Sequence, residues 1–294
     1  MSPPRAVACL LDAKAELGEC PRWHAGEERL YFVDIARAEL HRYHPQSGAH
    51  EVRGFEEPVG CFAFRRGGGF VLAMRDGFWA LADFAGTPQP IGPMVDAARP
   101  DNRFNDGRCD ARGRFFAGTM TTTKRVADGA LFRLDPDGRA VQLEAGVLTS
   151  NGIAFSPDAR TFYYADTPNH VIYAYDFDAE RGAIANRRVF REFPYGQGRP
   201  DGAAVDSDGD YWSALYAGGR VVRLSPQGAA QEEVAIPALH VTCISFGGPD
   251  LCTAFVTTAR ANTDAAALAR YPLAGGIFTF RVERPGLAEP MYAG

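Results

Sequence analysis

Four oxygen-bearing side chains recur along the sequence at nearly regular intervals: Glu19, Asn105, Asn151 and Asp201. If the fold brought them together, the two carboxylates would repel and raise each other's pKa unless a cation lay between them. Carboxylate and carboxamide oxygens suit Ca²⁺, Mg²⁺ or Mn²⁺, and Zn²⁺ or Fe²⁺ also accept them. A single Asn-Gly or Asp-Gly pair usually only forms a turn. Recurrence in register, with a glutamate at the same phase, favours one divalent metal site.

The residues that follow these positions recur as well. The stretches that begin at Asn105, Asn151 and Asp201 each contain a glycine, a short apolar run, an Asp-containing turn and an aromatic-rich strand. Weaker copies flank them, and the equivalent positions of six units are Glu19, Gly60, Asn105, Asn151, Asp201 and Cys243. A repeat of roughly 40 to 50 residues is typical of a four-stranded propeller blade. The sequence therefore predicts an all-β fold, a six-bladed β-propeller with a central metal-binding channel.

The two ends of the chain fit a closed ring. The N-terminal stretch "RAVACLLD" reads as a strand that pairs with "GIFTFRV" near the end of the last unit, which would cover an exposed sheet edge. No linker or low-complexity segment interrupts the units, so we expect a single domain over residues 1–294. Because the inner strands of a propeller surround one channel, residues at equivalent positions of different blades should converge there.

Composition and charge narrow the class of partner. A net charge of −5 with mixed signs leaves no basic face for nucleic acid and no polybasic membrane anchor. The N-terminus does not read as a signal peptide and no stretch is apolar for the length of a spanning helix. The six cysteines contain no C-x-x-C pair, and we expect reduced, mostly buried thiols. We therefore expect a cytoplasmic protein, a monomer or weak homo-oligomer, with a small-molecule partner.

Several motifs together resemble a known family. "LGECPRW", "RFNDGRCDARGRFFAGTM", "SNGIAFSPD", "PDGAAVDSDGDYW" and "FGGPDL" with "YPLAGGIF" stand in the order found in the senescence-marker-protein, gluconolactonase and luciferin-regenerating enzyme family. The resemblance implies a six-bladed propeller with one divalent ion in its channel, and hydrolysis of sugar lactones to aldonic acids. It also implies that Glu19, Asn151 and Asp201 bind the metal, and that Arg103 and Asn105 contact substrate hydroxyls.

The chemistry of these residues agrees with that role. A divalent ion polarises a lactone carbonyl, and Asp201 could act as the general base towards the attacking water. Arg103 could donate hydrogen bonds to hydroxyls or to developing negative charge. The sequence departs from the family pattern shortly after the G-T-M stretch. Some relatives carry an acidic residue there, whereas this chain has three threonines that end in Thr123. We predict that Thr123 contacts the substrate through its hydroxyl, without a charge. It also carries Cys20, where glycine or serine is usual, and we expect this cysteine to pack inertly.

Two other functions fit the same residues. A phosphotriesterase-like hydrolase could place the same ion against a phosphoryl oxygen. A non-catalytic propeller could instead use the metal structurally and serve as a binding platform. The diagnostic residues lie at inner-strand starts and face the channel, which favours a small-ligand site and thus the sugar lactonase.

Overall fold

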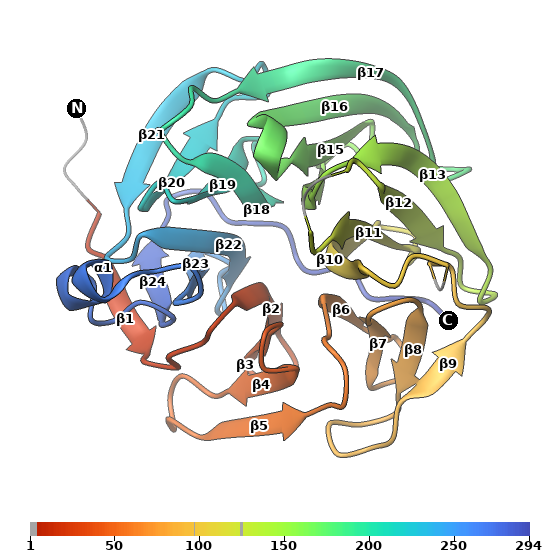
Figure 1. Ribbon diagram of the computed structural model, residues 1–294, viewed down its shortest axis with the longest axis horizontal. Helices are drawn as coiled ribbons and strands as arrows, with labels where there is room; N and C mark the ends of the chain where they lie inside the picture. The colour runs from red at the N-terminus through yellow and green to blue at the C-terminus, as the bar shows by residue number, and fades with distance from the viewer. Residues whose placement is uncertain (1–4, 97, 124–125) are drawn as a thin grey trace.

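Six four-stranded sheets stand around a common centre like the blades of a propeller (Figure 1). The computed structural model describes residues 5–96, 98–123 and 126–294. Neighbouring strands in each sheet run antiparallel. They also follow one another along the chain, except that β1 pairs with β24. The all-β, six-bladed β-propeller predicted from the repeat is confirmed.

The first three blades follow the chain from the inside of the ring outwards. Blade 1 consists of β2 (Gly18–His24), β3 (Arg29–Asp34), β4 (Glu39–Tyr43) and β5 (His50–Gly54). Blade 2 consists of β6 (Cys61–Phe64), β7 (Phe70–Ala73), β8 (Phe78–Leu81) and β9 (Gln89–Ile91). Blade 3 consists of β10 (Asn102–Cys109), β11 (Phe115–Thr121), β12 (Gly129–Leu134) and β13 (Ala140–Val147).

The other three blades complete the ring. Blade 4 consists of β14 (Ser150–Phe155), β15 (Thr161–Asp166), β16 (Val171–Asp178) and β17 (Ala183–Glu192). Blade 5 consists of β18 (Arg199–Val205), β19 (Tyr211–Tyr216), β20 (Arg220–Leu224) and β21 (Ala230–Ala235). Blade 6 consists of β22 (His240–Gly247), β23 (Thr253–Ala259), β24 (Ile277–Arg281) and β1 (Ala8–Leu11). A 3-10 turn, η1 (Thr167–Asn169), and one short helix, α1 (Ala265–Arg270), lie in connections.

Strand β1 supplies the outer strand of blade 6. It pairs antiparallel with β24, with Ala8 opposite Thr279 and Cys9 opposite Phe278. A strand from near the start of the chain thus pairs with the edge of a sheet whose other strands come from residues 240–281, which closes the ring between the two ends of the chain. No helix among the described residues is both long and apolar enough to cross a lipid bilayer.

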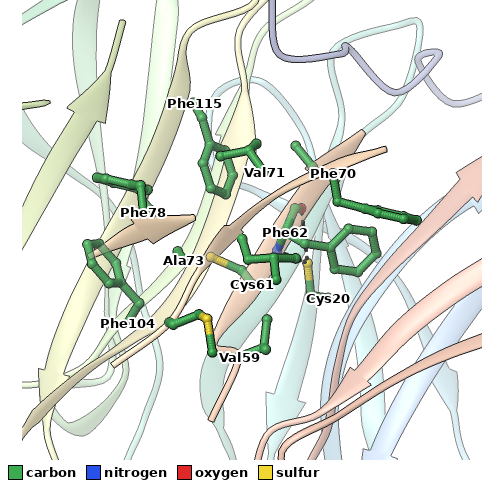
Figure 2. Close-up of a cluster of buried hydrophobic side chains, with 14 of the residues drawn as sticks. Cys20, Val59, Cys61, Phe62, Phe70, Val71, Ala73, Phe78, Phe104 and Phe115 are labelled. Atoms are coloured by element: carbon green, nitrogen blue, oxygen red, sulfur yellow. Dashed lines mark hydrogen bonds between the residues drawn. The ribbon is translucent and has the colours of Figure 1, made fainter. Parts of the chain in front are cut away.

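Burial falls from the inner to the outer strands. All four residues of β6 are buried, whereas most of β17 is exposed and rich in arginine and glutamate. A strand covered on both faces reads as a continuous apolar run, and a charged outer strand discourages edge-to-edge aggregation. Aromatic rings fill the space between blades. Figure 2 shows one such cluster, in which the Phe78 and Phe104 ring centroids lie 4.9 Å apart.

The C-terminal segment, residues 282–294, passes behind the ring from blade 6 to the blade 2 and blade 3 side (Figure 1). The Tyr292 N–H donates to the Phe64 carbonyl, and the Tyr292 hydroxyl donates to the Asp135 carbonyl. On the way, the Glu289 side chain, 6% exposed, pairs with two arginines of inner strands, at 3.0 Å from Arg22 Nε and 3.1 Å from Arg108 Nη1. The segment therefore ties three separate blades together on the underside.

Candidate active site

The inner strands bring the predicted polar residues to one pocket at the centre of the ring. Glu19, Arg103, Asn105, Asn151 and Asp201 all line it, although they come from four different blades. The described residues also contain a larger groove of about 800 Å³ between blades 1 and 2, with aromatic and methionine side chains in its walls. That groove is lined by Glu56, Glu57 and Asp76 but by none of the residues predicted from the repeat, so the central pocket is the candidate site.

Each contributing strand presents two residues to the pocket, because side chains at positions i and i+2 lie on one face of a strand. The deeper set, which we call the ligand ring, consists of Glu19, Asn105, Asn151 and Asp201, each at most 6% exposed. The set two positions earlier, which we call the mouth ring, consists of Leu17, Arg103, Thr149 and Arg199. Three of these four are only half-buried, so the mouth ring lies closer to solvent.

A break in strand register accompanies every member of the ligand ring. Pairing with the second strand of the blade shifts between Glu19 and Arg22, and again between Pro200 and Ala203 around Asp201. The strands that carry Asn105 and Asn151 shift at the same place. The inner strand of blade 2 pairs without a shift, whereas the inner strand of blade 6 shifts between Val241 and Cys243 although it carries no ligand-ring residue. Bulges commonly occur beside functional sites, and all four ligand-ring residues lie at one.

The glycines directly after Asn151 and Asp201 allow neighbouring inner strands to approach closely. A Cβ on Gly202 would lie 2.3 Å from the Cys243 Sγ atom, in the adjacent strand β22. A Cβ on Gly152 would lie 2.4 Å from the Tyr211 hydroxyl, and Gly152 also has a φ of +61° that favours glycine. The motifs N-D-G, S-N-G and P-D-G therefore combine a functional side chain with the glycine that lets its strand fit.

Two buried aspartates hold the segments that lead into the ligand ring. The Asp34 carboxylate accepts hydrogen bonds from the N–H groups of Glu16 and Leu17, at 2.8 and 3.0 Å. Asp166 does the same in blade 4, where it accepts from the N–H groups of Leu148 and Thr149. Both aspartates fix the backbone just before Glu19 and Asn151.

A chain of hydrogen bonds sets the orientation of the Asn151 carboxamide. The Thr167 hydroxyl donates to the Pro200 carbonyl at 2.7 Å, so it can only accept from Asn151 Nδ2, at 2.8 Å. Asn151 Oδ1 is therefore turned the other way, where it accepts from Asn105 Nδ2 at 3.0 Å. Arg103 Nη1 in turn donates to Asn105 Oδ1 at 2.7 Å. The sequence did not single out Thr167, which lies in η1 of the same blade, because the direction of its hydroxyl depends on the Pro200 carbonyl in strand β18 of the next blade.

Burial and like charge dominate the electrostatics of the ligand ring. The pKa of Glu19 is raised well above its ordinary value, first by burial and then by the nearby charges of Asp201 and Asp106. Burial also lowers the pKa of Arg103 to about 10, which still leaves it cationic at neutral pH. Buried carboxylates in this position are stabilised in their charged form by a cation placed between them.

The residues present fit a divalent cation. Two carboxylates and a carboxamide whose oxygen is fixed by Thr167 form an all-oxygen donor set. Clusters of three or more His, Cys, Asp or Glu side chains in a metal-binding arrangement are absent from the described residues. A site here would therefore depend on Asn151 as its third protein ligand.

The two departures from the family pattern differ in their surroundings. Thr123 lies on the surface, where its hydroxyl is 3.0 Å from the Thr121 hydroxyl, and it is not among the residues that line the pocket. Its role as a substrate contact stays a prediction. Cys20 is buried with its Sγ atom 3.6 Å from the Phe62 carbonyl oxygen, as the dashed line in Figure 2 marks, and burial raises its pKa to about 11. These contacts agree with inert packing.

Comparison with known proteins settles the family. Residues 17–260 match the SMP-30/Gluconolactonase/LRE-like region. The chain belongs to this family. A 6-deoxy-6-sulfogluconolactonase from Pseudomonas putida is 44% identical to this chain, over 98% of this chain and 99% of the relative. A pentonolactonase from Haloferax volcanii is 38% identical, over 89% of this chain and 88% of the relative.

A solved structure has nearly the same backbone as this chain. The crystal structure of a calcium-binding protein, regucalcin, from Agrobacterium tumefaciens superposes with a TM-score of 0.94 at 28% identity, over 98% of both chains. The resemblance stated from the sequence motifs is therefore confirmed. The family and its lactonase relatives make this chain an enzyme of the sugar lactonase type.

Proposed function

We propose that this protein is a metal-dependent hydrolase that opens the ester ring of a sugar lactone to give the aldonic acid. The observation that carries the proposal is the meeting of two buried carboxylates, Glu19 and Asp201, with the oriented Asn151 oxygen in one pocket. Family membership supports the same class of substrate. The arrangement would be unfavourable as a merely structural feature, because buried like charges destabilise a fold.

Glu19, Asn151 and Asp201 would hold the divalent ion, for which Ca²⁺, Zn²⁺, Mn²⁺, Mg²⁺ and Fe²⁺ are the candidates. When bound, such an ion polarises the lactone carbonyl and offsets the negative charge that develops on its oxygen. The regucalcin neighbour is described as calcium-binding, which makes Ca²⁺ the first ion to test.

The protein's own side chains would supply the proton transfers and the orientation. Asp201 would accept a proton from water as the water oxygen bonds to the carbonyl carbon, and that proton would pass to the ring oxygen as its bond to the carbon breaks. Arg103 would donate to sugar hydroxyls. Asn105, whose Nδ2 already donates to the Ser150 carbonyl and to Asn151 Oδ1, would accept from them at its Oδ1 atom. Thr123 would contact the substrate from the surface. The acid product then ionises and releases one proton.

The names of two relatives suggest which lactones to offer as substrates. Sulfogluconolactone and pentonolactone are the substrates named for two relatives that cover nearly all of this chain. Gluconolactone, galactonolactone, xylonolactone and arabinonolactone complete a panel of ring sizes and hydroxyl arrangements.

Proton release followed with a pH indicator tests the proposal. Metal-free protein and protein with each divalent ion are assayed on the panel, next to Glu19→Gln, Asp201→Asn and the exposed control Glu192→Gln. We expect metal-dependent acid production that falls at least about a hundredfold in both pocket variants, since each removes a charge that acts in the transition state. The control should match the wild type.

One result would refute the lactonase, and another would refute the assigned site. If no lactone is opened faster than its spontaneous hydrolysis with any ion, an organophosphate substrate becomes the next test. If the two pocket variants retain full activity, the reaction takes place elsewhere on the protein.

A further inference from the structure

The charged residues that line the pocket leave a surplus of positive charge once a divalent ion is bound. The lining contains two carboxylates, Glu19 and Asp201, and two guanidinium groups, Arg103 and Arg199. These four charges cancel, so a bound divalent ion brings the local sum to +2. A neutral lactone would leave that charge uncompensated in a pocket whose deeper wall is buried. An anionic substituent on the substrate would offset it.

The two arginines are held differently. Arg103 already uses its Nη1 atom on the Phe104 carbonyl and the Asn105 Oδ1 atom, at 2.9 and 2.7 Å. Arg199 stacks, with its guanidinium 5.0 Å from the centre of the Tyr216 ring. Stacking uses the flat face of a guanidinium and leaves the N–H donors along its edge available. Arg199 is therefore the pocket arginine whose donors are best placed for a ligand.

The neighbours of Arg199 form a built platform. The His240 ring stacks on Tyr216 with centroids 4.2 Å apart, and Asn262 Nδ2 donates to the Tyr216 hydroxyl at 3.1 Å. Because that oxygen accepts from Asn262, its own proton can be donated to a ligand. Tyr216, Asn262 and Arg199 all line the pocket. Together they offer N–H and O–H donors on one wall, as an anion requires.

The position of Arg199 in its strand relates this platform to the reacting bond. Arg199 precedes Asp201 by two residues in β18, so it belongs to the mouth ring while Asp201 belongs to the ligand ring. A substrate whose carbonyl lies against the ligand ring would extend its far end towards Arg199. Burial, then the Arg199 cation, lowers the pKa of His240, which agrees with a neutral histidine beside an uncompensated positive charge.

We propose that Arg199, with Tyr216 and Asn262, forms a subsite for an anionic group, a sulfonate or carboxylate, at the end of the sugar lactone remote from its carbonyl. This inference rests on the proposed lactonase function and adds to it the class of substrate: lactones that carry a second, negatively charged group. Arg199 is then a specificity-determining residue.

The test compares lactones that differ in this one group. Rates of ring opening are measured for gluconolactone, for its 6-deoxy-6-sulfo analogue and for the carboxylate-bearing glucarolactone, with wild type, Arg199→Met and Arg199→Lys. Arg270→Met is the matched control. The Arg270 guanidinium also stacks on a tyrosine ring, 5.2 Å from its centre against 5.0 Å for Arg199, but Arg270 lies in the exposed helix α1.

We expect Arg199→Met to lower kcat/KM for the two anionic lactones by about tenfold to a hundredfold, the value of a charge-assisted hydrogen bond. The neutral lactone should change by about twofold, Arg199→Lys should recover part of the loss, and Arg270→Met should change none of the three. A sulfonate-only loss would assign the subsite to sulfonates, and a carboxylate-only loss to carboxylates.

A second measurement separates this inference from the lactonase proposal. Calorimetry on the metal-loaded protein compares its affinity for gluconate and 6-deoxy-6-sulfogluconate, which needs no turnover. If wild type opens no lactone, the lactonase proposal fails, yet an Arg199-dependent preference for the sulfonated acid would still support the subsite. Equal losses for neutral and anionic ligands in Arg199→Met, or no loss for either, would overturn it.

Discussion

Replacing Thr167 by valine should weaken metal binding, although Thr167 is not itself a proposed ligand. Valine keeps the shape of threonine and removes the hydroxyl that accepts from Asn151 Nδ2 at 2.8 Å and donates to the Pro200 carbonyl at 2.7 Å. Both contacts are buried, so the Asn151 amide nitrogen loses its partner. An unsatisfied buried donor costs about 1 to 3 kcal/mol. The carboxamide can escape this cost only by turning over, which points its NH₂ group at the metal.

The Asn105 contact limits the size of the effect. Asn105 Nδ2 donates to Asn151 Oδ1, so a turned carboxamide would set two donors against each other. One of the two constraints on the Asn151 orientation therefore survives, and we expect a loss of about tenfold in affinity, at the low end of what outer-shell partners contribute. Calorimetric titration of the metal-free protein with Ca²⁺ and Mn²⁺ measures it.

The controls use the same chemical change. Thr149 also lines the pocket, and its hydroxyl has no hydrogen-bond partner among the described residues, so Thr149→Val should leave metal affinity within about twofold of wild type. Thr167→Ser keeps the hydroxyl and should bind nearly as tightly as wild type. If Thr167→Val binds the ion as tightly as wild type while its thermal unfolding is unchanged, the orientation argument is wrong.

Two further predictions concern stability. Glu289→Gln should cost about 3 kcal/mol in urea unfolding, because it leaves buried Arg22 and Arg108 unneutralised, whereas Glu180→Gln, which breaks an exposed pair, should cost under about 1 kcal/mol; equal costs would contradict this. Burial, with the His50 charge, lowers the pKa of His41 in the folded protein to about 4. As the pH falls below 6.5, the ordinary pKa of histidine, His41 therefore takes up a proton in the unfolded state but not in the folded state. Stability is therefore complete above pH 6.5 and falls towards pH 4 by about 1.4 kcal/mol per unit at most; His41→Gln should lose about 2 kcal/mol less than wild type between pH 7 and pH 5.

The repeat was readable from the sequence because the inner strands of blades 3, 4 and 5 each begin with Asn or Asp and a nearby glycine that lets two inner strands approach. Glu19 lies at the same phase of blade 1, so it could be placed in one pocket with Asp201, and the structure brings them there. Arg199 was missed, although alternation along a strand predicts that the residue two positions before Asp201 shares its face. Its significance depends on Tyr216, which reaches it only through the pairing of β18 with β19.

The orientation of Asn151 could not be predicted, for a different reason. It depends on the Thr167 hydroxyl, and the direction of that hydroxyl is set by the Pro200 carbonyl of the next blade. Contacts between blades have no fixed spacing in the sequence. The repeat therefore locates the residues of the site, whereas their hydrogen-bond directions follow from how the blades pack.

The path of the C-terminal segment also constrains the order in which the protein can be assembled during translation. Blade 1 and blade 3 leave the ribosome with Arg22 and Arg108 lacking Glu289, which emerges long afterwards. Strand β1 likewise waits for β24 before it has a partner. Early blades are thus synthesised as incomplete units with buried cations unneutralised. A nascent chain halted before residue 282 would present these blades to chaperones and proteases, and the ring would become resistant only when its last residues pass beneath it.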